Sequence, residues 1–250
     1  MKISDFQKLL KTNAAIQISP TAMIFDDFEL WNPKTDKSTQ YDSLEALLKD
    51  NPEVADKIEA ARAFYVELRG GRGADAGGMG GGFSFGRNPS QSRTLQNANL
   101  NFNTAQRNSL EDVIERFKGK YGTSDREYGA SIDEEGFVHR LAIGQRGAVQ
   151  VEPLAGQTIV HNHPNGSAFS GQDLLTVAST GARGVVALSS SSTTKGDYYF
   201  RKTSKFRAKD FIKAIRKAQW PKNLNYNEGV DWWLRKNQQT YGYTYRSTKG

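Results

Sequence analysis

The stretch TIVHNHPNGSAFSGQD, residues 158–173, contains two of the three histidines in this 250-residue chain. They end a short apolar run that is typical of a buried strand. Because side chains two positions apart on a strand point to the same face, His161 and His163 can both reach one metal ion. The chain has no cysteine, which excludes disulfides and thiolate ligands, so histidine or carboxylate must hold any transition metal.

The residues after the histidines predict a turn and the start of a helix. Pro164 and Gly166 end the strand. Ser170 and Asp173 have the S-x-x-D spacing of a helix cap, which would carry the Asp173 carboxylate back toward the two imidazoles. Alone, this spacing indicates only a cap, and an isolated H-x-H indicates only a surface coincidence. Together they gather two histidines and a carboxylate with a fourth position open, as in catalytic zinc sites.

The segment HNHPNGSAFSGQD resembles the JAMM signature of the JAB/MPN metalloprotease superfamily, which reads an upstream Glu, then H-x-H-P, then S-x-x-D. It is most similar to bacterial and phage members, including the RadC-like group. The resemblance implies that His161, His163 and Asp173 bind Zn²⁺. It also implies that Ser170 stabilises the oxyanion that forms when water attacks an amide carbonyl. The resemblance covers residues 109–218.

The family also has a glutamate that acts as general base, on the strand after the first helix. The segment REYGASID follows the helix expected at residues 109–118, and its Glu-x-Gly is similar to that of family members. Glu127 is therefore the predicted base. Glu134, Glu135 and Glu152 are the alternatives, and the first two are more typical of a hairpin turn.

Two departures from the family's pattern lie in and beside the site. His163 and Asp173 are one residue closer in sequence than in most zinc-dependent members, so the loop between them must be tighter. The segment between the Glu strand and the His strand lacks the extra helix that many relatives carry. The third histidine, His139, lies upstream on a strand-like run and is expected to face solvent or a neighbouring side chain.

From residue 109 onward, apolar patterns and turn signals predict the order helix, four strands, helix, two strands and helix. The resemblance implies an α/β domain of the JAB/MPN type, also called cytidine-deaminase-like, with a mixed sheet flanked by helices. Nine glycines among residues 70–86 predict a linker after a small α+β unit. The predicted organisation is an N-terminal α+β unit, a Gly-rich and polar linker, the metalloprotease domain and a basic, aromatic C-terminal extension, at residues 1–69, 70–108, 109–220 and 221–250.

The formal net charge of +7 is concentrated near the C-terminal end. Residues 201–250 hold thirteen Lys/Arg and three Asp/Glu, whereas residues 1–200 hold 21 and 24. A basic segment interleaved with aromatic side chains indicates a nucleic-acid or acidic partner. The alternative is a structural role, in which Val230, Trp232 and Leu234 pack onto the sheet and the tyrosines alternate on a strand.

No apolar run approaches the roughly 20 residues that cross a bilayer, so no contact with a membrane is expected. The N-terminal MKISDFQKLLKTNAAIQIS lacks the continuous apolar core of a secretory signal. A cytoplasmic protein is therefore expected, in the host cytoplasm if the chain is phage-encoded.

Two functions are consistent with these patterns. The first is a zinc-dependent peptidase or isopeptidase that acts on a protein or peptide, such as a ubiquitin-like conjugate. The second is a JAB-like binding or structural module without catalytic activity, associated with a phage particle or with nucleic acid. Metal content distinguishes the two.

Overall fold

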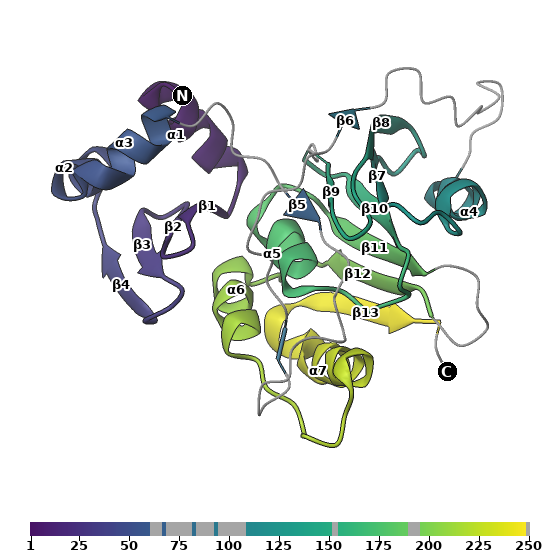
Figure 1. Ribbon diagram of the computed structural model, residues 1–250. Helices are drawn as coiled ribbons and strands as arrows, with labels where there is room; N and C mark the ends of the chain where they lie inside the picture. The colour runs from purple at the N-terminus through teal and green to yellow at the C-terminus, as the bar shows by residue number, and fades with distance from the viewer. Residues whose placement is uncertain are drawn as a thin grey trace.

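The described residues form a mixed α/β structure of a four-stranded and a seven-stranded sheet with helices packed on them, and a separate two-stranded pair (Figure 1). The computed structural model describes residues 1–60, 67–68, 82–83, 93–94, 109–151, 155–189 and 196–248. Over these ranges, none of the helices combines the length and apolar character needed to cross a membrane.

The N-terminal residues form a four-stranded antiparallel sheet covered on one face by three helices. The strands are β1 (Ala15–Ser19), β2 (Ala22–Phe25), β3 (Glu29–Asn32) and β4 (Lys37–Gln40), and the helices are α1 (Ile3–Thr12), α2 (Leu44–Asp50) and α3 (Pro52–Ala60). Successive side chains of β2 point to opposite faces of this sheet. Ile24 packs under the helices, whereas Met23 and Phe25 pack on the other face. Phe28, at φ 64°, breaks the apolar run into β2 and β3. The strand β4 was not predicted.

The second part of the chain forms a seven-stranded mixed sheet in the order β13-β12-β11-β10-β7-β8-β6. The predicted order of helix, four strands, helix, two strands and helix is confirmed. The elements are α4 (Leu110–Tyr121), β7 (Tyr128–Ile132), β8 (Val138–Ile143), β9 (Val149–Gln150), β10 (Thr158–His163), α5 (Gly171–Ser179), β11 (Gly184–Ser189), β12 (Tyr198–Lys202), α6 (Ala208–Lys217), α7 (Tyr226–Tyr241) and β13 (Tyr243–Ser247), with β6 at Arg93–Thr94. β9 differs from the others, because it pairs outside this sheet with β5 (Glu67–Leu68).

Helices cover the two faces of the large sheet unequally, as Figure 1 shows. α4 covers one face, where Val113 and Phe117 pack against Val160 of β10. α5, α6 and α7 cover the other face, where Leu174 and Phe211 belong to the largest apolar cluster. Ser109 and Asp112 form a capping box at the start of α4. The histidine strand is therefore sandwiched between helices.

The last residues of the chain complete the large sheet. β13 pairs antiparallel with β12, and α7 packs on the face shared with α5 and α6. Val230 and Leu234 are buried as expected, and Tyr243 and Tyr245 alternate inward along β13. The predicted packing of Trp232 is wrong: Trp232 is 36% exposed and Trp233 is buried instead. In a helix, Trp233 lies nearer to the stripe that Val230 and Leu234 define.

Charged side chains join the N-terminal sheet to α6. Lys209 Nζ lies 2.6 Å from an Asp27 carboxylate oxygen, and Lys213 Nζ lies 2.7 Å from Glu29 Oε1. Lys209 also pairs with Glu29, which is only 5% exposed. Part of the positive charge of residues 201–250 is therefore neutralised by carboxylates of the same chain.

Two described residues of the Gly-rich segment contact this part of the fold. The Phe83 ring packs edge-on against Trp220 and Trp233, with centroid distances of 5.4 and 5.3 Å. A Cβ on Gly82 would lie 2.9 Å from the Ala218 carbonyl oxygen, so the backbone passes close to the end of α6. Most of the predicted linker at residues 70–108 lies outside the described residues.

Candidate metal centre

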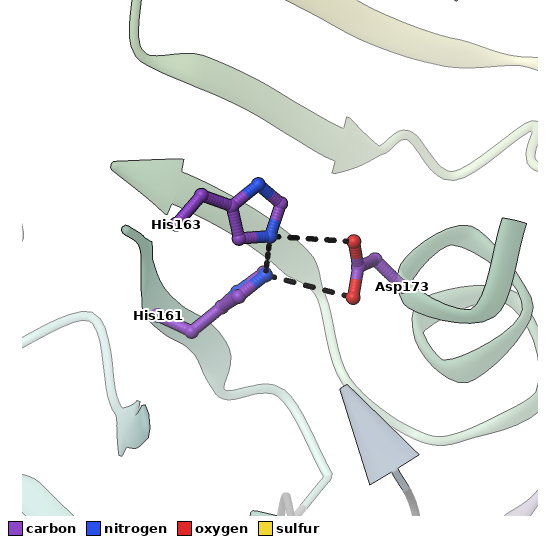
Figure 2. Close-up of side chains that lie close together, drawn as sticks. All are labelled: His161, His163 and Asp173. Atoms are coloured by element: carbon purple, nitrogen blue, oxygen red, sulfur yellow. Dashed lines mark hydrogen bonds and ion pairs between the residues drawn. The ribbon is translucent and has the colours of Figure 1, made fainter. Parts of the chain in front are cut away.

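β10 brings the two histidines into the middle of the large sheet. Every residue of this strand is buried, and the strand runs antiparallel to β7 and parallel to β11. His161 pairs with Gly129 on one side and Ala187 on the other, and His163 pairs with Ser189. Both imidazoles point toward α5 (Figure 2), as their spacing on a strand predicts.

A tight turn returns the chain from β10 to α5. Gly166, at φ 63°, adopts a left-handed conformation that favours glycine, and its N–H donates to the His163 carbonyl at 2.8 Å. Ser170 then caps the helix: its Oγ accepts the Asp173 N–H at 3.1 Å, and its own N–H donates to Asp173 Oδ2 at 2.7 Å. The predicted helix cap is present, and the shortened loop brings Asp173 back toward the two histidines as predicted.

Three side chains converge on one point (Figure 2). The Nε2 atoms of His161 and His163 are 2.7 Å apart. Asp173 Oδ1 lies 3.5 Å from the first and Asp173 Oδ2 lies 3.6 Å from the second. One donor atom from each residue lies within 4.8 Å of the others, and all three side chains are 0% exposed.

This arrangement fits a four-coordinate metal ion after a small adjustment. Tetrahedral bonds of about 2.0–2.1 Å place neighbouring donor atoms about 3.3 Å apart. The carboxylate oxygens of Asp173 are already near that separation from the imidazoles. The two imidazole nitrogens, now at hydrogen-bond distance, would have to separate by about 0.6 Å. Three protein donors leave a fourth coordination position for another ligand.

Hydrogen bonds determine which nitrogen of each histidine can bind a metal. His163 Nδ1–H donates to the Ser167 carbonyl at 2.7 Å, so its Nε2 carries a lone pair. His161 Nε2–H then donates to that lone pair. Among the described residues, His161 Nδ1 has no hydrogen-bond partner. A metal ion between the two Nε2 atoms would replace the hydrogen that now joins them.

The electrostatics of the site favour a cation. Burial, and then the charge of His161, lower the pKa of His163 to about 4, so this imidazole is neutral at pH 7. Burial acts to raise the pKa of Asp173, but attraction to His161, with further contributions from His163 and the Ser170 N–H, outweighs it and lowers the pKa. The centre therefore presents a carboxylate and a lone-pair nitrogen in a buried environment, where a charged group needs a partner of opposite charge.

Glu127 immediately precedes β7, the strand that pairs with the histidine strand β10. Its N–H donates to the Gln145 carbonyl, and its carbonyl accepts from Gly144. The antiparallel pairing of β7 with β10 ends at Gly129 and His161, two residues after Glu127. The side chain of Glu127 is fully buried.

The alternative glutamates lie elsewhere. Glu134 is in the turn after β7, where its carboxylate accepts from Arg201 and pairs with Arg183. Glu135 is exposed in the same turn, as expected for a hairpin residue. Glu152 lies outside the described residues. Among the described glutamates of this set, Glu127 alone adjoins the start of the strand that pairs with β10.

Asn162, between the two histidines, has a structural role that its position in the sequence did not predict. Its Nδ2 donates to the Arg126 carbonyl at 2.9 Å, and its Oδ1 accepts the Tyr128 N–H at 2.6 Å. The amide side chain thus joins β10 to the residues flanking Glu127, where main-chain pairing between the strands has ended. A polar residue inside a wholly buried strand is the sequence signal, since buried amides must be hydrogen-bonded.

Comparison with known proteins gives no relative for this chain. No family model matches it, and neither a curated protein nor a solved structure does. What the chain shows by itself is a mixed α/β fold with a buried His161-His163-Asp173 centre that could hold a metal ion.

Proposed function

We propose that this chain is a metal-dependent amide hydrolase, a zinc peptidase or isopeptidase of the JAB/MPN type. The convergence of His161, His163 and Asp173, with ligand atoms within 4.8 Å of one another, carries the proposal. The buried Glu127, two residues before the Gly129 that pairs with His161, supports it, because a general base must lie near the attacking water. The order of a helix, the strand after Glu127, a hairpin, the His strand and the Asp helix also agrees with that family's fold.

Zn²⁺ bound by these three residues would lower the pKa of a water from 15.7 to about 7 and polarise the substrate carbonyl. Glu127 takes a proton from the water as its oxygen adds to the carbonyl carbon. Glu127 then delivers that proton to the amide nitrogen as the C–N bond breaks, which yields a carboxylic acid and an amine. Ser170 Oγ accepts the Asp173 N–H, so its own O–H remains available to donate to the oxyanion.

The second candidate is a JAB-like module in which the metal is structural or absent. The observation that favours it is the complete burial of the three metal-ligand side chains and of Glu127. Structural zinc sites are closed, whereas catalytic sites keep a position open to substrate. For hydrolysis, a peptide must therefore displace residues that cover the site.

Metal content tests the first step of the proposal. The purified protein should hold about one equivalent of zinc, and His163→Ala should lose it because a two-donor site binds weakly. His139→Ala is the matched control: His139 lies exposed on β8, as expected, and pairs with Asp133 at 2.7 Å. Retention of zinc by His163→Ala, or a metal-free wild type after zinc loading, would contradict the proposal.

Activity distinguishes the enzyme from the closed module. Glu127→Gln should keep the metal and lose at least about a hundredfold in hydrolysis of peptides and ubiquitin-like conjugates, because the proton acceptor is gone. A wild type that binds zinc and hydrolyses none of these substrates would favour the module. Salt-sensitive binding of DNA or RNA by such a protein would then indicate a nucleic-acid partner. We also propose that the protein is cytoplasmic.

A further inference from the structure

The loop between His163 and Asp173 is held from outside by the first turn of α7. The Ala168 N–H donates to Asn227 Oδ1 at 2.8 Å. The Tyr226 hydroxyl donates to the Phe169 carbonyl at 3.0 Å. These contacts join segments that are 59 and 57 residues apart in sequence, so they are tertiary contacts rather than local turn geometry.

Each contact reaches a metal-ligand side chain through a single peptide group. The N–H of Ala168 and the carbonyl of Ser167 belong to one planar unit, and that carbonyl accepts from His163 Nδ1 at 2.7 Å. Because the unit is rigid, Asn227 fixes the direction in which the carbonyl meets the imidazole. A hydrogen bond at the N–H also polarises the carbonyl and makes it a better acceptor.

The second contact repeats this geometry on the other side of the centre. The Phe169 carbonyl and the Ser170 N–H belong to the next but one peptide group, and that N–H donates to Asp173 Oδ2 at 2.7 Å. Tyr226 therefore fixes the peptide group that orients the Asp173 carboxylate.

The start of α7 is itself well anchored. Asn225 caps the helix with a full capping box, in which Glu228 takes part. Gly229 lets Trp220 pack on this turn, because a Cβ there would lie 2.2 Å from the indole. Two adjacent residues on a capped helix are thus suited to hold a short loop in a fixed position.

We infer that Asn227 and Tyr226 are positioning residues of the metal centre, acting on His163 and Asp173 through one peptide group each. This inference rests on the proposed function for its metal readout only. Mutation of a group that hydrogen-bonds a metal ligand typically lowers metal affinity by about 10- to 100-fold.

Three variants and one control test the inference. Asn227→Leu removes the acceptor with little change in size, and Asn227→Asp keeps an acceptor oxygen. Tyr226→Phe removes only the hydroxyl. Asn237→Leu is the control, because Asn237 lies on α7 and bonds the Trp233 carbonyl at 2.8 Å, on its own helix rather than on the loop.

Cobalt titration, followed by its visible absorption, should show about tenfold weaker binding for Asn227→Leu and for Tyr226→Phe. Asn227→Asp and Asn237→Leu should bind as the wild type does. Equal binding by Asn227→Leu and the wild type would overturn the inference, and so would an equal loss in Asn237→Leu.

A second readout needs no metal. Nitrogen chemical shifts should show His163 in the Nδ1–H form in the wild type, in Asn227→Asp and in Tyr226→Phe. Asn227→Leu should show a mixture of the two tautomers, because its peptide acceptor is no longer oriented. An unchanged tautomer in Asn227→Leu would overturn the inference. A wild type that binds no cobalt would contradict the proposed function, whereas the tautomer result would still decide the role of Asn227.

Discussion

At the scale of single residues, the absence of a side chain at position 129 shapes the surroundings of His161. Gly129 pairs with His161 across β7 and β10. A Cβ at this position would lie 2.3 Å from Val151 Cγ2 and 3.0 Å from Val149 Cγ1. The valines at and after β9 therefore pack directly over the glycine, on the face of the sheet where the histidines lie.

Gly129→Ala should lower the free energy of unfolding by about 1–3 kcal/mol, because the added methyl group overlaps two valine side chains in a close-packed core. Urea unfolding measures the change. Gly119→Ala is the control, since Gly119 lies in α4 and its Cβ would meet nothing within 4 Å. This control should gain about 0.5–1 kcal/mol from helix propensity. Equal stability of Gly129→Ala and the wild type would show that β9 moves aside freely.

At the scale of secondary-structure elements, the phase of α7 decides which tryptophan stabilises the fold. Trp233 is 6% exposed and contacts Phe83, whereas Trp232 is 36% exposed and lies under the Lys236 ammonium, 4.6 Å from its ring centroid. Trp233→Ala should therefore cost about 3–5 kcal/mol, and Trp232→Ala under about 1 kcal/mol. Thermal unfolding of the two variants makes the comparison. Similar losses of stability in the two variants would contradict the burial of Trp233 and the exposure of Trp232 on α7.

A lysine from β12 caps the C-terminal end of α5, the helix that carries Asp173. Lys202 Nζ donates to the Val177 carbonyl at 2.9 Å and to the Thr180 carbonyl at 2.8 Å. Lys202→Met should therefore cost about 1–3 kcal/mol, because two helix carbonyls lose their donor. Chemical unfolding at pH 7 measures the loss.

The same lysine predicts a dependence of stability on pH. Burial lowers the pKa of Lys202 from 10.5 to about 8. Between these values the unfolded chain binds more protons than the folded one, so this group raises the free energy of unfolding as the pH rises from 8 toward 10.5. The stability difference between the wild type and Lys202→Met should grow across that window. A constant difference would indicate that Lys202 stays charged in the folded protein.

The sequence contains enough information for the elements of the site but not for its surroundings. The H-x-H and S-x-x-D spacings fix which side chains share a face and which residue caps α5, because both depend on local periodicity. The strand β4 escapes detection because its KSTQ is polar and exposed on both faces, without alternation. The role of the Ser167 carbonyl cannot be predicted either. Every residue supplies a backbone acceptor, so the residue type gives no signal.

At the scale of the whole molecule, long-range ion pairs explain the uneven charge of the chain. Lysines of α6 meet carboxylates about 180 residues earlier, an arrangement that no local pattern predicts. The basic segment thus serves in part to attach the N-terminal sheet. This pairing leaves fewer free cations on α6 for a nucleic-acid or other acidic partner.

Glu29 is central to this attachment. Burial acts to raise its pKa, but hydrogen bonds from Lys209 and Lys213 outweigh burial and lower it. A carboxyl with a lowered pKa stabilises the fold above its ordinary pKa of 4.5, and this contribution is lost as the pH falls through the lower, folded value. Acid should therefore weaken the attachment of the N-terminal sheet.

Glu29→Gln should lower the free energy of unfolding by about 1–3 kcal/mol at pH 7, because two ammonium groups lose a charged acceptor. The deficit should shrink when salt is raised to about 1 M, where the screening length is about 3 Å. Asp42→Asn, at an exposed carboxylate of the same unit, is the control and should change stability by under about 0.5 kcal/mol. A deficit that does not respond to salt would mean that packing, rather than charge, holds the units together.

Complete burial of the three converging side chains has a kinetic consequence. A chelator in solution cannot contact an ion held between atoms that are 0% exposed, so release must wait for a local opening of the fold. The rate of metal loss should then reach a plateau as chelator concentration rises, and the plateau equals the opening rate. If turnover depends on the same opening, a single slow motion of the molecule sets both the lifetime of the bound ion and the pace at which substrates enter.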